Sequence, residues 1–211
     1  MARPSQQLDA AMLESGRALY PGAGCAGLSV RSVADHAGVN PGMFHYHFGS
    51  KDKFLRTLLA GLYEEMYSGL QIEVAAGRPA IERLRAALLM LARFLRENRR
   101  VIARVWMDAV GGEVIAREFM QANGPRHIGV LLALLHEAER DGSIAALPAT
   151  QSLTFVLGAV GMPLIFTSAL VDAGVAPPAL RPYFDAGVMS DAAVAQRVDL
   201  ALRALRTKDE P

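Results

Sequence analysis

The segment from Ser29 to Lys51 restricts the possible folds more than any other part of the chain. Apolar side chains recur from Val30 to Ala37 at the i, i+3, i+4 and i+7 spacing of one helical face, about two turns long. A second helix of similar length ends near Phe48, and a third, longer helix starts with Lys51. The segment therefore predicts two very short helices joined by a tight turn.

Capping residues stand at the expected ends of these short helices. Ser29 is a good N-cap for the first helix, and Gly38 follows at the position where a helix end needs a left-handed residue. Asn40 caps the second helix and Pro41 occupies its first position, where a missing N–H costs nothing. Ser50 caps the third helix, so that the local chemistry supports a helix-turn-helix arrangement.

The second short helix has two different faces. Phe44 and Phe48 lie one turn apart and are expected to point inward. The residues expected on the opposite face and on its flanks are Gly42, Met43, His45 and Tyr46. A stable protein has little structural use for so short and polar a helix. DNA has a direct use for it, because the major groove admits one helix and short side chains in its N-terminal half read the base edges.

Three motifs carry a resemblance to a known family. They are Ala37-Gly38-Val39-Asn40, Tyr46-His47-Phe48 and Gly49-Ser50-Lys51. In these motifs the chain resembles the tetracycline-repressor (TetR) family of bacterial regulators, over roughly residues 8–60. It departs from the family pattern at Cys25, where an aromatic residue is usual, and at His45, where many members have tyrosine.

The resemblance implies an all-α fold with an N-terminal three-helix helix-turn-helix DNA-binding domain over residues 1–60. A larger helical domain for effector binding and dimerisation would cover residues 61–211. The predicted DNA contacts are Ser29, Arg31, Asn40, Pro41, Gly42, Met43, His45, Tyr46, His47 and Lys51. For His47 the helical wheel indicates the inner flank, whereas the family indicates a phosphate contact, and the prediction follows the family. His36 is expected to be solvated or to pack between helices.

Composition allows this function. The net charge is only +1, but a small DNA-binding domain needs only local positive charge, such as that of Arg31 and Lys51. Apolar residues make up 52% of the chain, which is enough for a large core. The single cysteine, Cys25, excludes an internal disulfide, fits the cytoplasm and is expected to be a small buried hydrophobe. No secretion signal opens the chain.

Helical periodicity continues through the rest of the chain, and no alternating strand pattern of useful length interrupts it. The predicted helix ends are at Pro21-Gly22, near Gly77, at Gly111-Gly112, at Asn123-Gly124-Pro125 and at Asp141-Gly142. A proline-rich loop is expected around residues 177–182, before a last helix over about 191–206. The fold class is therefore predicted as all-α.

The resemblance also implies a ligand cavity in the second domain. Its predicted lining is Phe94, Trp106, Met107, Phe119, Met120, Met162 and Phe166, although aromatic and methionine side chains of this kind are usually core. Such a pocket would be apolar and adaptable, and it would take a hydrophobic small molecule with one polar end. Arg104, Asp108 and Glu113 could orient that polar end, but solvated charges are the commoner outcome.

Residues 142–171 contain no charge, and Leu153–Val171 is long enough to span a bilayer. Pro163 interrupts this stretch, and neither a basic cluster nor an aromatic belt flanks it. A helix that is apolar all round is equally typical of a buried helix or a subunit interface. The prediction is a homodimer formed through this segment and the last long helix, with no membrane partner.

No catalytic constellation, P-loop or dinucleotide motif is present, and the histidine spacings do not form a metal pair. The chain is therefore predicted to be neither an enzyme nor a protein that needs a cofactor or metal. The leading hypothesis is a cytoplasmic repressor that a small hydrophobic effector releases from a palindromic operator. The alternative is a helical membrane-associated or ligand-carrying protein whose N-terminal helices bind another protein.

Overall fold

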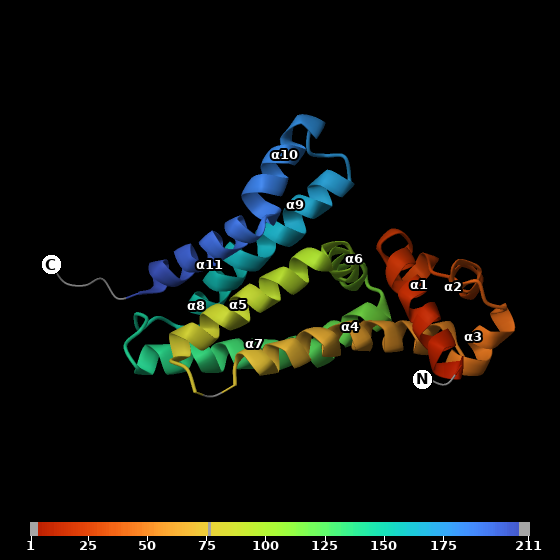
Figure 1. Cartoon of the computed structure of the whole chain (residues 1–211), viewed down its shortest axis with the longest axis horizontal. Coiled ribbons are helices and arrows are strands. Elements are labelled where there is room, and N and C mark those ends of the chain that lie inside the picture. Colours follow the sequence, from red (N-terminus) through yellow and green to blue (C-terminus); the bar gives the residue numbers. More distant parts are fainter. Residues whose placement is uncertain (1–3, 76, 207–211) are drawn as a thin grey trace. The chain divides into compact units, whose positions relative to one another are not determined.

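The computed structural model describes residues 4–75 and 77–206, and every regular element in these ranges is helical (Figure 1). The all-α prediction is confirmed. The elements are α1 (Pro4–Gly27), α2 (Val30–Ala37), α3 (Pro41–Phe48), α4 (Lys51–Glu73), α5 (Ala80–Glu97), α6 (Arg99–Val110), α7 (Val114–Arg140), α8 (Ala149–Val156), the π-helix η1 (Leu157–Gly161), α9 (Met162–Asp172), the 3₁₀-helix η2 (Pro178–Leu180), α10 (Arg181–Phe184), the π-helix η3 (Asp185–Met189) and α11 (Asp191–Leu205).

The chain packs as two units. The first unit contains Met1–Glu65 and Val101–Asn123, and the second contains Met66–Arg100 and Gly124–Pro211. Helices α4, α6 and α7 each contribute residues to both units. These units are defined by packing, so the functional division at residue 60 stays a prediction.

The predicted caps of the two short helices in the first unit are confirmed. The Ser29 hydroxyl accepts a hydrogen bond from the Ser32 amide, and the Ser32 hydroxyl in turn accepts one from the Ser29 amide, which closes a capping box. Gly38 ends α2 in the left-handed conformation, with φ of 66°. The Asn40 side chain accepts from the Gly42 amide, and Pro41 opens α3. These contacts fix both helices at the predicted places.

Three phenylalanine rings form the core beneath α3. Phe44 and Phe48 are buried as predicted, with their ring centroids 5.5 Å apart. The ring of Phe54, on α4, lies 4.9 Å from each of them. Because aromatic pairs at these separations contribute beyond their buried area, the rings tie α3 to the start of α4.

The first helix does not end where the sequence predicted. Helical geometry continues past Pro21, and the break comes at Gly24, where φ is 64° and ψ is −170°. The backbone conformation at residue 24 is one that only glycine adopts easily, and the helix breaks there and not at Pro21. The sharp corner before α2 is therefore built at Gly24.

Two further predicted interruptions are wrong. Helix α7 runs through Asn123-Gly124-Pro125 without ending. There the Asn123 carbonyl accepts from the Tyr63 hydroxyl at 2.8 Å, and the Asn123 side chain donates to the Phe119 carbonyl. The proline-rich loop is instead a series of short helices, η2, α10 and η3. Pro178 at the first position of η2 and Pro182 at the second position of α10 suit helix starts, because no amide is needed there.

The second unit is a helical bundle in which α5 packs against α9 and α11 (Figure 1). Its buried side chains include Leu84 and Leu88 of α5, Leu164 of α9, and Val198 of α11. Between α8 and α9 the chain widens into a π-turn, in which the Met162 amide donates to the Leu157 carbonyl. Pro163 follows at once and lacks an amide, so the normal helical ladder cannot continue through it.

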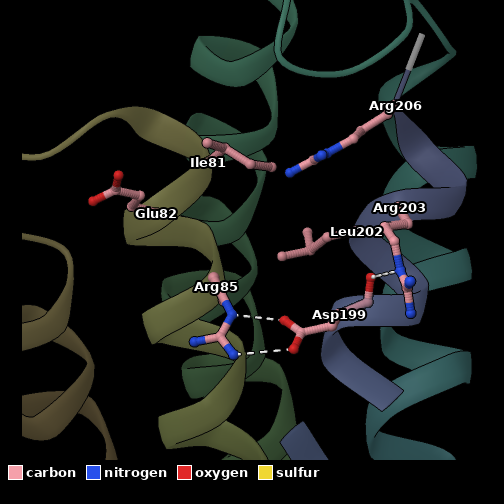
Figure 2. A pocket seen from close by; sticks show the side chains of 7 residues that line it. All are labelled: Ile81, Glu82, Arg85, Asp199, Leu202, Arg203 and Arg206. Carbon is pink, nitrogen blue, oxygen red and sulfur yellow. Dashed lines mark hydrogen bonds and ion pairs between the residues drawn. The ribbon is translucent and has the colours of Figure 1, made fainter. Parts of the chain in front are cut away.

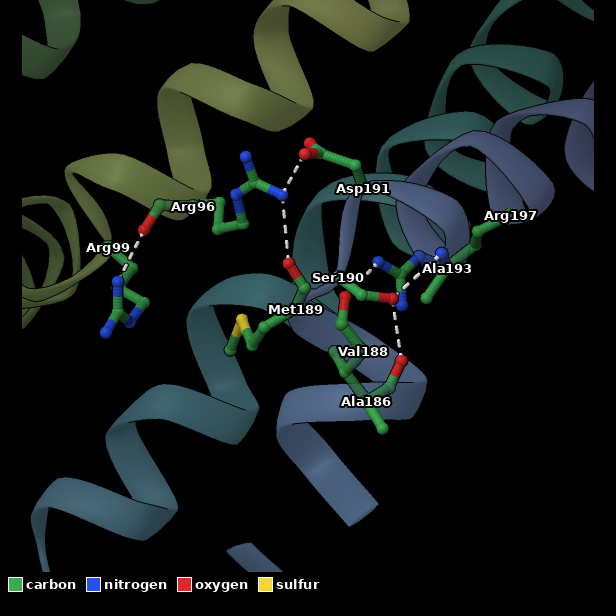
Figure 3. Close-up of polar contacts among 9 residues, drawn as sticks. All are labelled: Arg96, Arg99, Ala186, Val188, Met189, Ser190, Asp191, Ala193 and Arg197. Atoms are coloured by element: carbon green, nitrogen blue, oxygen red, sulfur yellow. Dashed lines mark hydrogen bonds and ion pairs between the residues drawn. The ribbon is translucent and has the colours of Figure 1, made fainter. Parts of the chain in front are cut away.

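Arginines anchor the segment that leads into α11 (Figure 3). Arg96 donates to the Met189 carbonyl at 2.9 Å and to the Asp191 carboxylate at 2.8 Å. Arg197 donates to the Val188 carbonyl at 2.8 Å, and burial lowers the pKa of its guanidinium. These donors satisfy carbonyls at the end of η3 that have no helical partner.

Within the described ranges, one helical run, Ala149–Asp172, is long and apolar enough to cross a membrane by length and composition. The core helix of a soluble protein meets the same criteria. Leu153, Val156, Leu164 and Ile165 of this run are buried in the second unit.

Candidate nucleic-acid interface

The outer face of α3 is free of packing contacts at its centre. The Tyr46 side chain is 80% exposed, although its neighbours two residues away, Phe44 and Phe48, are buried. Pro41, Gly42 and His45 are also exposed, and Met43 is half-buried. Helix α3 therefore has one face fixed in the core and one face presented to solvent, as a helix that reads a groove requires.

Several predicted contact residues already have partners within the protein. The side chains of Ser29 and Asn40 act as helix caps. Arg31 is exposed and lies 3.6 Å from the Asp35 carboxylate, a surface pair that contributes little and that a phosphate can replace. A ring nitrogen of His45 lies 3.2 Å from the Gly49 carbonyl. Arg31, His45 and Tyr46 are thus the long polar side chains of the predicted set that solvent reaches most directly.

His47 lies where the helical wheel indicated and not where the family pattern did. Its side chain is 4% exposed, and Nδ1 is 2.5 Å from the Asp9 carboxylate of α1. In this position the ring ties α3 to α1. The phosphate contact of His47 stays a prediction, which the burial of its ring does not favour.

Lys51 also has an internal role. Its ammonium donates to the Ala26 carbonyl at 2.8 Å and so connects the start of α4 to the corner before α2. Lys53, in the same first turn, is exposed, and within the described part of the chain its ammonium has no recorded partner. Lys53 was not in the predicted set, although its position beside a capped helix N-terminus was a signal for a phosphate contact.

The predicted ligand residues do not gather in one unit. Trp106, Met107, Phe119 and Met120 belong to the first unit, whereas Phe94, Met162 and Phe166 belong to the second. Met107 and Phe166 are 65% and 63% exposed, and Trp106 is 39% exposed. The assignment of these residues to an effector stays a prediction.

A hollow of about 400 Å³ lies in the second unit between α5 and α11 (Figure 2). Its lining is Ile81, Glu82, Arg85, Asp199, Leu202, Arg203 and Arg206. Arg85 forms two hydrogen bonds to the Asp199 carboxylate, at 2.6 and 3.1 Å. None of the predicted ligand residues contributes to this hollow, and its charged lining differs from the apolar pocket that was predicted.

A polar cluster of buried Tyr20, Cys25 and Asp108 with half-buried Arg104 lies in the first unit. The Asp108 carboxylate accepts from the Tyr20 hydroxyl at 2.8 Å, the Cys25 amide at 2.7 Å and the Arg104 guanidinium at 2.8 Å. Sequence reasoning missed this cluster because its members are distant in the chain. No cluster of three or more potential metal ligands occurs in the described ranges.

Electrostatics of the cluster follow from burial and hydrogen bonding. Burial favours the neutral form of Asp108, but the donors from Cys25, Tyr20 and Arg104 outweigh it and lower the pKa of the carboxyl below its usual 3.8. Burial, with the contacts to Cys25 and Asp108, raises the pKa of the Tyr20 hydroxyl. Burial also raises the pKa of the Cys25 thiol, and Cys25 is buried as predicted.

The lowered pKa of Asp108 predicts how stability depends on pH. The charged carboxylate stabilises the fold fully above its unfolded pKa, near 3.8, and this contribution is lost as the pH falls through the lower folded pKa. Tyr20 and Cys25, whose pKa values are raised, keep their protons throughout this range. In urea unfolding, the difference in unfolding free energy between wild type and Asp108→Asn should shrink between about pH 5 and about pH 2. A difference that stays constant would contradict the lowered pKa.

Comparisons with known proteins agree with this arrangement. Residues 12–58 match the model of the family described as bacterial regulatory proteins, tetR family. The HTH-type transcriptional regulator BetI of Brucella anthropi is 32% identical over 71 residues, which are 34% of this chain and 36% of that protein. The HTH-type transcriptional repressor Rv3405c of Mycobacterium tuberculosis is 28% identical over 140 residues, which are 62% of this chain and 68% of the repressor.

A solved structure extends the likeness beyond the N-terminal region. The transcriptional regulator FadR from Bacillus subtilis, in complex with stearoyl-CoA, matches with a TM-score of 0.69 at 13% sequence identity. The match covers 93% of this chain and 99% of that one, so it concerns the fold of both regions. By sequence, the matched part spans only about a third of BetI.

Proposed function

The chain belongs to the TetR family of bacterial regulatory proteins, and we propose that it is a repressor that binds operator DNA as a homodimer. The observation that carries this proposal is α3, whose inner face is locked by Phe44 and Phe48 while Tyr46 projects into solvent. Such a helix fits the major groove, where side chains at the surface meet base edges. Two-fold symmetry would place the two α3 helices about 34 Å apart, one turn of a palindromic operator.

Affinity in this proposal comes mainly from a few phosphate contacts. Arg31 before α3 and Lys53 after it are the nearest exposed Lys or Arg side chains on either side of this helix. The net charge of the whole chain is only +1. Binding should therefore weaken steeply with salt, while the preference for the operator persists. A gel shift with DNA from upstream of the gene, repeated at rising salt, tests this. If no fragment shifts and the protein partitions into vesicles instead, the repressor proposal is overturned.

The homodimer is proposed to form through α8, α9 and α11. Exposed apolar side chains lie on these helices, including Phe155, Phe166 and Leu200. Obligate subunit interfaces are apolar in this way, and a monomer seldom leaves such side chains uncovered.

A charge at Phe166 should break this dimer. Phe166→Glu is expected to give a soluble monomer in light scattering at micromolar concentration, because a carboxylate would have to be desolvated in the interface. Ile72→Glu, at an equally exposed apolar position on α4, serves as the matched control and should remain dimeric. A wild-type protein that is itself monomeric would refute the proposed interface.

The effector is proposed to be a small hydrophobic molecule with one polar end. The fold that this chain shares with FadR carries stearoyl-CoA in that protein, a ligand with a long apolar chain and a polar group. Release from DNA requires the ligand to favour a conformation whose two α3 helices no longer match the groove spacing. Thermal-shift screening followed by a gel shift tests this, and apolar hits that leave operator affinity unchanged would count against it.

A further inference from the structure

The corner between α1 and α2 is shaped to receive Arg104 of α6. At Gly24 φ is 64°, and a Cβ atom there would lie 2.2 Å from Nη2 of Arg104. The guanidinium therefore lies directly on the glycine backbone, and the same Nη2 donates to the Ala23 carbonyl at 3.4 Å. Gly24 thus permits the corner in two ways. It adopts the positive φ that the turn needs, and its lack of a side chain leaves room for the Arg104 guanidinium.

Asp108, one helical turn after Arg104, completes the contact. Its carboxylate is buried, and its Oδ2 accepts from both the Tyr20 hydroxyl and the Cys25 amide. The Cys25 amide follows the break at Gly24, and Asp108 gives it a charged acceptor at 2.7 Å. The Tyr20 proton is directed to Asp108, which leaves the Cys25 thiol to donate to the Tyr20 oxygen at 3.2 Å. Every group in the corner is therefore oriented by this carboxylate.

The corner leads directly into the DNA-reading helices. Three residues separate Cys25 from Ser29, the cap of α2, and one of them, Leu28, is buried. The Lys51 ammonium binds the Ala26 carbonyl from the other side, at the start of α4. Since α2 and α3 pack on each other through a short turn, a shift of the corner moves both.

We propose that Asp108 is a positioning residue for DNA recognition: its carboxylate sets the α1–α2 corner and thereby the orientation of α2 and α3. The inference rests on the proposed function, because it concerns operator binding. A buried charge is a costly way to gain stability, since apolar side chains of the same volume often stabilise as well. The charge here orients its neighbours, because the three donors of Tyr20, Cys25 and Arg104 must converge on the two oxygens of one carboxylate. Residues 20 and 25 are thereby fixed relative to α6.

The test is Asp108→Asn, which keeps the shape but replaces one acceptor oxygen by a donor. Operator affinity should fall by about tenfold or more, as expected when hydrogen bonds to a charged group are lost. Affinity for random DNA should change much less, so that the ratio of the two affinities falls. Hydrogen exchange should quicken at the amides of Cys25 and Ala26. Folding is verified by circular dichroism at the temperature of the titration.

Two control variants separate positioning from loss of stability. Asp199→Asn is the same substitution in the second unit, where it removes the pair with Arg85. Leu84→Ala removes a fully buried side chain of α5 and should lower the melting temperature. Both should keep the wild-type affinity ratio and the wild-type exchange at Cys25. If Asp108→Asn does not fold, Tyr20→Phe removes one donor and should give a smaller loss in the same direction.

The outcomes are distinct. If wild type binds its upstream DNA and folded Asp108→Asn keeps the same affinity ratio, the positioning role is overturned and the repressor proposal stands. The role is equally overturned if Leu84→Ala lowers the ratio as much as Asp108→Asn does. If wild type binds no DNA, the repressor proposal fails and the inference fails with it. Faster exchange confined to the corner, together with a lower ratio, supports it.

Discussion

Replacing Phe44 with alanine is expected to lower the free energy of unfolding by about 3–5 kcal/mol, the usual loss for a large aromatic side chain in a core. The ring is buried and has the rings of Phe48 and Phe54 within 5.5 and 4.9 Å. Helix α3 is only two turns long and has little stability of its own, so it depends on this contact. Urea unfolding followed by circular dichroism measures the loss, and operator binding should disappear with it.

The matched control is Ile72→Ala, which removes an exposed apolar side chain of α4. It should change the unfolding free energy by less than about 0.5 kcal/mol. If Phe44→Ala lowers the unfolding free energy by less than about 1 kcal/mol, the three rings do not pack against one another in solution.

Replacing Tyr46 with alanine should leave the free energy of unfolding nearly unchanged but weaken operator binding. The side chain is 80% exposed, so the unfolding free energy should change by less than about 0.5 kcal/mol. Operator affinity should fall about 10- to 100-fold, as expected when a base-reading side chain is removed. Binding to random DNA should fall less, because phosphate contacts provide most of it. Gel shifts on both DNAs measure the two effects.

Tyr183→Ala is the matched control, since Tyr183 is an exposed tyrosine of the second unit. It should leave both DNA affinities unchanged. An operator affinity that is the same for Tyr46→Ala and wild type would show that the outer face of α3 does not read the groove.

Local chemistry was sufficient to predict the short helices of the first unit. Ser29, Gly38 and Asn40 act within three residues of their own positions, so a cap can be recognised without knowing the fold. The inward direction of Phe44 and Phe48 follows from helical periodicity in the same way. These are the parts of the interface that sequence predicted correctly.

Long-range contacts account for what sequence could not predict. The Asn123 carbonyl finds the Tyr63 hydroxyl 60 residues away, which helps α7 continue through Pro125. Asp108 meets Cys25 across 83 residues, and neither residue has a local signal for the other. For His47 the helical wheel and the family pattern disagreed, and the ring lies on the inner flank that the wheel indicated, against Asp9 of α1.

The contact between His47 and Asp9 limits which residues of α3 can change operator preference. Helix α3 is held to the protein by positions 44, 47 and 48, and none of these side chains is available to DNA. The residues at positions 42, 45 and 46 are exposed and do not attach α3 to the core. If α3 reads the operator as proposed, substitutions of His45 and Tyr46 are expected to alter the bound sequence with little effect on folding. Gly42 is different, because a Cβ atom there would lie 3.2 Å from the capping oxygen of Asn40. In that proposal, recognition and folding depend on interleaved but separate residues of one eight-residue helix.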